Sequence, residues 1–132
     1  MLCLSPTYEL ALQTGEVASK MSQFAPEITI RYAVRGEEIR RGGKITDHII
    51  IGTPGKVLDW SLKFRFFDLK KIKVFVLDEA DVMIDTQGHQ DQSIRIQKNL
   101  SPSCQMMLFS ATYEKDVMDF AENVIVNPVV SC

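Results

Sequence analysis

The sequence predicts an α/β fold, a three-layer arrangement in which a parallel sheet is flanked by helices. Short apolar runs alternate along the chain with longer segments whose apolar residues recur at helical spacing. This alternation is typical of a parallel sheet that is covered on both faces. The chain has 132 residues, 45% of them hydrophobic, which is enough for one domain with its own core.

Five strands are expected, because short runs are either continuously apolar or alternate between apolar and polar residues. They are placed at residues 2–5, 28–34, 48–52, 73–77 and 105–109, with a further candidate at residues 124–130. In the second run, Ile28, Ile30 and Tyr32 fall on one side of the strand. After their first residues, Lys73 and Gln105, the fourth and fifth runs are continuously apolar, as expected for strands that are buried on both faces.

Helices are expected between these strands, at residues 7–24, 54–62, from 81 onward, 91–100 and 114–123. In the first, Leu10, Val17 and Met21 recur at helical spacing and Pro26 ends the segment. Pro54 suits the first position of the second helix. Residues 35–44 form a polar, glycine-containing loop.

Composition excludes several classes of protein. The net charge is −2, so binding of phosphate groups would have to be local, through helix ends and a few Arg or Lys side chains. Three widely spaced cysteines form neither a disulfide framework nor a zinc site, which favours a reducing compartment. No apolar run is long enough to span a bilayer, and no secretory signal is present, so membrane insertion is not expected.

Three carboxylates follow the fourth strand within four positions, in the run Asp78-Glu79-Ala80-Asp81. Carboxyl ends of parallel strands are where open α/β sheets bind ligands. Carboxylates there can hold Mg²⁺, directly or through water, and can polarise a nucleophile. The alternative is a helix that simply begins with acidic residues, which the helix dipole favours by about 0.3–1 kcal/mol each.

Hydroxyl groups follow the fifth strand in the same way, in the run Ser110-Ala111-Thr112. Adjacent parallel strands would bring these hydroxyls close to the acids, where they can form hydrogen bonds. The alternative is that they cap the helix expected at Glu114.

Two helices are expected to begin with proline after a strand, at Ser5-Pro6-Thr7 and at Thr53-Pro54-Gly55. Helix N-termini present free N–H groups to phosphate, and a glycine lets a backbone approach closely. Ordinary capping is the alternative for each start alone. Both starts together with the loop 35–44 indicate a track for a phosphate backbone.

These segments resemble motifs of the DEAD-box RNA helicases. Asp78-Glu79-Ala80-Asp81 resembles motif II, Ser110-Ala111-Thr112 motif III, residues 6–11 motif Ia, Thr53-Pro54-Gly55 motif Ib, and Arg35-Gly36 the glycine-containing RNA-contact loop. The motifs cover nearly the whole chain in the family's order. Residues 5–15 and 86–95 are similar to the subgroup that remodels messenger ribonucleoprotein at the nuclear pore during mRNA export, which includes a germ-cell paralogue.

The resemblance implies ATP as substrate, Mg²⁺ as cofactor and a role for each motif. Asp78 would hold Mg²⁺ through water, Glu79 would orient the attacking water, and Asp81 would link to Ser110 and Thr112. The residues that would lie along the RNA backbone, without reading its sequence, are Pro6, Thr7, Glu9, Arg35, Gly36, Thr53, Pro54 and Gly55. Messenger RNA and nuclear-pore export factors are the implied partners, and the nucleus, the cytoplasm and the nuclear-pore periphery are the implied locations.

The family's adenine-reading Q motif and its glycine-rich phosphate loop precede motif Ia and are not in this sequence, nor is the second RecA-like lobe with its arginine finger. The chain is therefore expected to be a piece of a larger protein, with residues 1–132 forming part of the first RecA-like lobe, from motif Ia to just past motif III. Alone it is expected to have no significant ATPase activity. The strand at 105–109 should have an unpaired apolar edge, and the stability should be marginal.

Two other functions fit parts of the sequence. The chain could be a non-catalytic RNA- or protein-binding fragment or short isoform. It could also be a phosphoacceptor receiver domain, which likewise places an Asp at a strand end. Receivers need an acidic pair after the first strand, where this sequence has Ser5-Pro6-Thr7.

Overall fold

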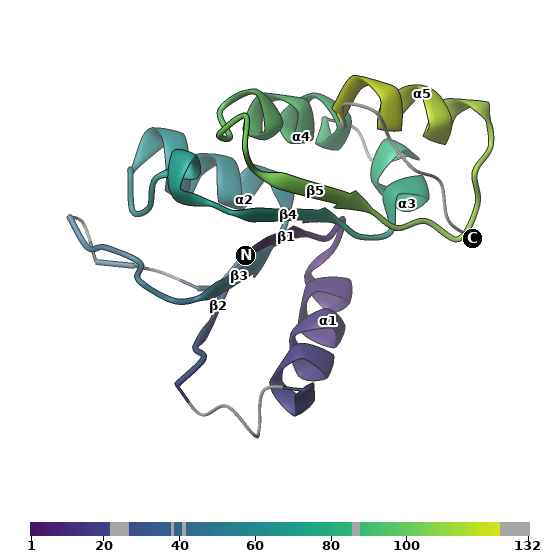
Figure 1. Cartoon of the computed structure of the whole chain (residues 1–132). Coiled ribbons are helices and arrows are strands. Elements are labelled where there is room, and N and C mark those ends of the chain that lie inside the picture. Colours follow the sequence, from purple (N-terminus) through teal and green to yellow (C-terminus); the bar gives the residue numbers. More distant parts are fainter. Residues whose placement is uncertain (22–26, 38, 41, 86–87, 125–132) are drawn as a thin grey trace.

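Five parallel strands form one sheet in the computed structural model, which describes residues 1–21, 27–37, 39–40, 42–85 and 88–124. The strands are β1 (Leu2–Leu4), β2 (Ile30–Ala33), β3 (Ile49–Gly52), β4 (Val74–Leu77) and β5 (Gln105–Leu108). Their order across the sheet is β2-β3-β1-β4-β5 (Figure 1). The predicted parallel α/β fold is confirmed, although each strand is one to three residues shorter than expected.

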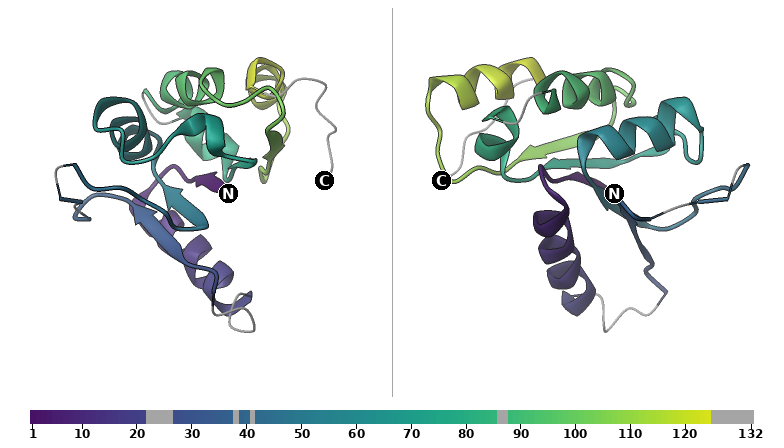
Figure 2. Two further views of the ribbon diagram at one scale, coloured as in Figure 1. Left: turned by 60° about the vertical axis from the view of Figure 1, so that its left-hand side comes forward. Right: turned by 180° about the vertical axis from the view of Figure 1, so that it is seen from behind.

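Helices cover the two faces of the sheet unequally. One face carries α1 (Tyr8–Met21) alone, whereas the other carries α2 (Pro54–Leu58), α3 (Ala80–Asp85), α4 (His89–Lys98) and α5 (Lys115–Val124) (Figures 1 and 2). Because side chains of a strand alternate between faces, β1 contributes to both cores. Leu2 and Leu4 belong to the large cluster under α2 to α5, and Cys3 belongs to the small cluster under α1.

Backbone hydrogen bonds extend the sheet one residue beyond its strands at the carboxyl edge. The first residue after a strand donates its N–H to the last carbonyl of the neighbouring strand, over 2.8–3.2 Å, in four pairs: Thr53 to Ala33, Ser5 to Gly52, Asp78 to Leu4, and Phe109 to Leu77. The segments that follow β1, β3, β4 and β5 are therefore held in register with one another.

The helix expected at residues 54–62 changes its winding after Leu58. Residues Asp59–Lys63 form a π-helical turn, which ends with a hydrogen bond of 2.8 Å from Phe64 N–H to the Asp59 carbonyl. The Ser61 hydroxyl donates to the Val57 carbonyl over 2.7 Å. This side chain competes for a carbonyl of the preceding turn, which gives a local reason for the wider winding.

Other boundaries also differ from expectation. A short 3-10 helix at Leu69–Lys71 was not predicted; the Asp68 carboxylate accepts a hydrogen bond from Lys70 N–H over 2.9 Å at its start. The candidate strand at 124–130 lies outside the described residues, except for Val124, which ends α5. No helix of the described residues is long and apolar enough to cross a membrane.

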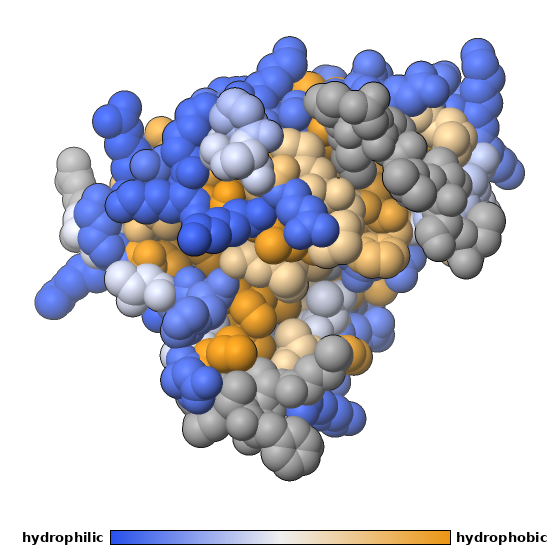
Figure 3. Space-filling view, viewed as in Figure 1, coloured by the Kyte–Doolittle hydropathy of each residue, from blue (hydrophilic) through white to orange (hydrophobic). Residues whose placement is uncertain are grey.

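Strand β5 lies at one end of the sheet and, within the described residues, pairs only with β4. This agrees with the expected unpaired edge. The Phe109 side chain, which follows β5, is 52% exposed. Figure 3, which has the same view as Figure 1, shows apolar surface across the middle of the molecule.

Candidate active site and RNA interface at the carboxyl edge of the sheet

All the sequence-predicted site residues follow the carboxyl ends of the parallel strands. Arg35 and Gly36 follow β2, Pro6 and Thr7 follow β1, the Thr53-Pro54-Gly55 turn follows β3, the acidic run 78–81 follows β4, and the hydroxyl run 110–112 follows β5. Glu9 is in the first turn of α1. Since the strands are parallel, these groups share one edge of the sheet, where α/β folds bind ligands.

The acidic run makes a tight turn between β4 and α3. Glu79 has φ 55°, a left-handed conformation that is uncommon for a residue other than glycine. Two hydrogen bonds of 3.0 Å hold the turn, from Ala80 N–H to the Phe109 carbonyl and from Met83 N–H to the Glu79 carbonyl. Strain of this kind costs on the order of 1–3 kcal/mol and persists where the surroundings fix it, often at functional sites.

Thr14 is a site residue that sequence reasoning missed. Its hydroxyl donates to Asp78 Oδ2 over 3.0 Å, in a partly buried position. In the sequence, Thr14 falls on the same face of the first predicted helix as Leu10, Val17 and Met21. The available signal was a polar side chain at a position of that face whose other members are apolar.

Negative charge is concentrated at the acidic turn. Burial, and then the neighbouring charges of Asp78 and Asp81, raise the pKa of the Glu79 carboxyl. Burial first, and then the Asp78 charge, raise the pKa of the Cys3 thiol to about 12. A cation at this turn would offset the mutual repulsion of the three carboxylates.

The residues present fit a magnesium ion held mainly through water. Asp81 Oδ1 is buried and has no hydrogen-bond partner among the described residues, so the acidic turn keeps an unsatisfied carboxylate oxygen, which favours a cation or a hydrogen-bond donor nearby. Among all the residues that the structure describes, no three His, Cys, Asp or Glu side chains lie close enough together to hold an ion directly. Mg²⁺ prefers oxygen ligands and usually keeps several waters beside one or two carboxylates.

The expected link from Asp81 to Ser110 and Thr112 is not made within the described residues. Ser110 Oγ instead accepts a long hydrogen bond of 3.4 Å from Thr112 N–H. This bond is local to the hydroxyl run and engages the Ser110 hydroxyl. The capping alternative also fails for this motif. Because α5 begins at Lys115, Glu114 occupies the cap position rather than Ser110 or Thr112.

The two proline-led turns differ in how their threonines are used. Thr7 Oγ1 accepts a hydrogen bond from Leu10 N–H over 3.2 Å, so Thr7 caps α1, which begins after Pro6 and not with it as expected. Thr53 precedes α2 but makes no capping hydrogen bond with its side chain. Capping therefore accounts for the Thr7 hydroxyl and leaves the half-buried Thr53 hydroxyl available.

Exposure separates the predicted RNA-contact residues. Thr7, Glu9, Arg35 and Gly36 are exposed, whereas Pro6 and Pro54 are buried and set the course of the backbone. Gly36 has φ 94°, and open space surrounds the position that a Cβ would take. The left-handed turn at Gly36 thus presents backbone to solvent at this edge.

Gln92 of α4 is a second residue that sequence reasoning missed. A Cβ on Gly55 would lie 3.3 Å from Gln92 Nε2, so the amide packs closely on the Thr53–Gly55 turn. Gln92 Oε1 is buried and has no hydrogen-bond partner among the described residues. No feature of the sequence marked Gln92, because its position depends on how α4 packs against α2.

Comparison with known proteins gives the family. Residues 1–120 match the sequence profile of the family described as DEAD/DEAH box helicase. The chain is 68% identical over 130 residues to DEAD-box helicase Dbp80 of Drosophila melanogaster, covering 98% of this chain and 28% of the relative. It is 65% identical over 129 residues to ATP-dependent RNA helicase DDX19B of Homo sapiens, covering 98% and 27%, and 61% identical over 129 residues to DDX25 of Mus musculus, covering 98% and 27%.

Solved structures agree with the sequence matches. S. cerevisiae Dbp5 bound to RNA and ADP BeF3 superposes with a TM-score of 0.86 at 39% identity, over 99% of this chain and 33% of that chain. A DEAD box protein from Methanococcus jannaschii superposes with a TM-score of 0.84 at 27% identity, over 96% and 34%. The chain thus spans between a quarter and a third of the length of these relatives. The profile match, the relatives and the shared fold show that this chain belongs to the DEAD/DEAH box helicase family.

Proposed function

We propose that residues 1–132 are the part of the first RecA-like lobe of an ATP-dependent RNA helicase that runs from motif Ia to just past motif III. In the longer protein, ATP binding would be coupled to clamping of RNA, and hydrolysis would release it. The observation that carries the proposal is the register of the carboxyl edge. Four backbone hydrogen bonds hold the acidic turn, the hydroxyl run and the two proline-led turns side by side.

The acidic turn would bind and orient the groups that react. Mg²⁺, when bound, would neutralise charge on the phosphates. Asp78, whose Oδ2 is already fixed by Thr14, would hold the ion through water with its other oxygen. Glu79 would position the attacking water and accept its proton, a role for which a raised carboxyl pKa makes it a stronger base.

The remaining turns would form the RNA track. Exposed Thr7, Arg35 and Gly36, together with the hydroxyl of Thr53, which makes no capping hydrogen bond, would offer contacts to phosphate and sugar along one edge. Such contacts position RNA without reading its sequence. Asp81, with its buried unpaired oxygen, would link this track to the acidic turn when Ser110 or Thr112 moves to meet it.

Relatives support a role in mRNA export. A variant of S. cerevisiae Dbp5 that superposes with a TM-score of 0.87 at 42% identity is bound to Nup159, a Gle1 variant, IP6 and ADP. By this similarity, the longer protein would remodel messenger ribonucleoprotein with nuclear-pore factors, in the nucleus, in the cytoplasm and at the pore periphery.

A chimaeric enzyme tests the proposal. The 132 residues replace the matching segment of human DDX19B, and RNA-stimulated ATP hydrolysis is measured. Hydrolysis comparable to that of the parent is expected, and it should fall by at least about 100-fold with Glu79→Gln, since positioned acid–base groups contribute 10²–10⁴-fold. Glu122→Gln, which removes a carboxylate from the exposed end of α5, is the matched control. An active chimaera that is indifferent to Glu79→Gln contradicts the assignment.

The second candidate, a non-catalytic fragment that binds RNA or protein, is favoured for the isolated chain by one observation. The 132 residues contain no glycine-rich phosphate loop with its lysine. We therefore propose that the chain alone does not turn over ATP. Salt-dependent binding of oligouridylate without any effect of ATP would support the binding fragment, and RNA-stimulated hydrolysis by the chain alone would exclude it.

A further inference from the structure

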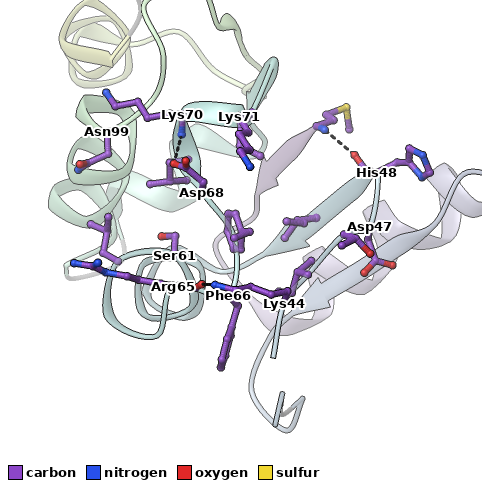
Figure 4. A pocket seen from close by; sticks show the side chains of 18 residues that line it. Lys44, Asp47, His48, Ser61, Arg65, Phe66, Asp68, Lys70, Lys71 and Asn99 are labelled. Atoms are coloured by element: carbon purple, nitrogen blue, oxygen red, sulfur yellow. Dashed lines mark hydrogen bonds between the residues drawn. The ribbon is translucent and has the colours of Figure 1, made fainter. Parts of the chain in front are cut away.

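A cavity of about 910 Å³ lies at the amino edge of the sheet, opposite the candidate active site. We call it the amino-edge groove. Its walls include Met1, His48 and Ile72, which precede β1, β3 and β4, and loop residues between Lys44 and Lys71 (Figure 4). The volume is typical of sites that bind a ligand.

The floor of the groove is apolar and firmly held. Ile45, Phe66 and Leu69 line it and belong to the main hydrophobic core. The Ile45 N–H donates to the Phe66 carbonyl over 2.8 Å, which ties the two sides of the floor together. Phe66 also packs edge-on against Trp60, with ring centroids 6.0 Å apart. The groove is thus a preformed apolar surface rather than a gap between loops.

The rim of the groove is positively charged although the chain as a whole has a net charge of −2. Four cationic side chains line it, on opposite walls: Lys70 and Lys71 on one, Lys44 and Arg65 on the other (Figure 4). The acidic lining residues are Asp47 and Asp68, and both are already engaged. Asp47 pairs with Arg31 over 3.1 Å, and Asp68 accepts from Lys70 N–H over 2.9 Å.

The rim cations keep capacity for a ligand. Lys44 Nζ donates to the Arg65 carbonyl over 3.2 Å and Lys70 Nζ to the Leu100 carbonyl over 3.3 Å, so each retains further donors. Within the described residues, neither Arg65 nor Lys71 has an ion-pair partner. Arg65 also has φ 55°, a left-handed conformation that is uncommon for a residue other than glycine.

We propose that the amino-edge groove binds an extended acidic peptide segment of a partner protein. Its apolar side chains would lie on the floor, and its carboxylates would pair with the cations on both walls. The cations are spread along two walls and do not converge on one point, and the floor between them is apolar. This arrangement suits alternating acidic and apolar residues better than a phosphate group, which needs converging donors, or an RNA backbone, which offers no apolar anchor.

The proposal does not depend on the proposed enzymatic function. The groove and the RNA track lie at opposite edges of the sheet, so both can be occupied at once. Occupancy of the groove would attach the lobe to a partner while the carboxyl edge stays open.

The test uses the 132-residue chain and a fluorescein-labelled octapeptide of alternating leucine and glutamate, with anisotropy as the readout. Saturable binding that weakens as salt rises is expected, because exposed charges are screened. The double variant Arg65→Glu, Lys71→Glu should weaken binding by about tenfold or more, given two lost pairs and the added repulsion. Lys20→Glu and Lys115→Glu, single reversals at exposed positions outside the groove, should change it by less than about twofold.

Two further peptides separate the contributions of charge and of apolar surface. Replacing glutamate by glutamine or leucine by serine should each abolish saturable binding. If the glutamine peptide binds as tightly as the original, or if oligouridylate displaces the peptide, the acidic-peptide proposal is overturned.

Amide chemical shifts of the unmodified chain give a measurement that does not rely on the variants folding. The labelled peptide should perturb Ile45, Phe66 and Lys71. Perturbations confined to Thr53, Gly55 and the start of α1 would place the peptide at the carboxyl edge and overturn the proposal.

Discussion

The Thr14 hydroxyl donates a hydrogen bond of 3.0 Å to Asp78 Oδ2, joining residues that are 64 positions apart in the sequence. Thr14 lies on α1, the helix that Thr7 caps at the proposed RNA track, and Asp78 opens the acidic turn. One side-chain contact therefore connects the element that begins at the track to the group proposed to hold the metal ion. The contact fixes one of the two carboxylate oxygens of Asp78.

Replacing Thr14 by valine should destabilise the chain by about 1–3 kcal/mol, because a partly buried carboxylate loses its donor while the volume is preserved. The free energy of unfolding in urea measures the loss. Thr14→Ser keeps the hydroxyl and should recover most of it, apart from the missing methyl. Equal losses for serine and valine would mean that packing, and not the hydrogen bond, explains the effect.

The raised pKa of Glu79 gives a stability difference that depends on pH. A carboxyl whose pKa is higher in the folded than in the unfolded chain binds its proton more tightly when the chain is folded. The protonated group therefore favours folding at pH values below the unfolded pKa. This contribution to stability is lost as pH rises through the folded pKa. Glu79→Gln should therefore be more stable than the unmodified chain at pH 7, by less than about 1 kcal/mol for a partly exposed group. The difference should disappear near pH 4, about where an unfolded Glu titrates. Urea unfolding at both pH values tests the sign.

The backbone of Glu79 contributes separately from its charge. At φ 55°, glycine is unstrained whereas alanine keeps the penalty, so Glu79→Gly should be more stable than Glu79→Ala by about 1 kcal/mol. Both variants lack the carboxylate, so their difference isolates the conformation. If the alanine variant is at least as stable, the left-handed turn is not maintained in solution.

Much of the fold could be predicted because it depends on local patterns. The continuous apolar run before Asp78 predicts a buried strand, and parallel strands necessarily place their carboxyl ends at one edge. The acidic turn, the hydroxyl run and the two proline-led turns could therefore be assigned to one site without coordinates. The DEAD-like run itself was informative because three carboxylates end an apolar strand, a costly arrangement without a cation.

What could not be predicted depends on packing between distant segments. Gln92 has no local signal that sets it apart, and Thr14 has only its polar side chain on an otherwise apolar helix face. Each becomes part of the site only when its helix docks. A helix beginning with Pro6 was expected, but α1 begins at Tyr8 with Thr7 as its cap, and Ser5 is completely buried. The widened turn at Asp59–Lys63 arises from a hydroxyl that competes for a helix carbonyl, a choice that periodicity does not reveal.

Gly15 of α1 packs directly against Tyr32 of β2. A Cβ built on Gly15 would overlap the Tyr32 ring. Gly15→Ala should therefore destabilise the chain by about 1–3 kcal/mol. This loss is expected even though alanine is a better helix former than glycine by about 1 kcal/mol. Adding Tyr32→Ala should recover part of the loss, since the ring that the methyl meets is gone. Thermal unfolding of the two single variants and the double variant gives the coupling between the sites. A stabilising Gly15→Ala would mean that Tyr32 is free to move aside.

One edge of β5 pairs with no strand of the described residues, which predicts self-association of the isolated chain. The N–H and C=O groups on this edge, beside partly exposed Met106, Met107 and Leu108, form a template for pairing with another copy. Gln105→Lys places a charge on this edge at an exposed position. It should lower the fraction of the protein that sediments or scatters light at a given concentration. The free energy of unfolding should change by less than about 0.5 kcal/mol. Asn123→Lys adds the same charge to the exposed end of α5 and controls for a general effect of net charge on solubility. Equal improvement by both variants would assign the association to overall charge, whereas improvement by Gln105→Lys alone would place it at the β5 edge.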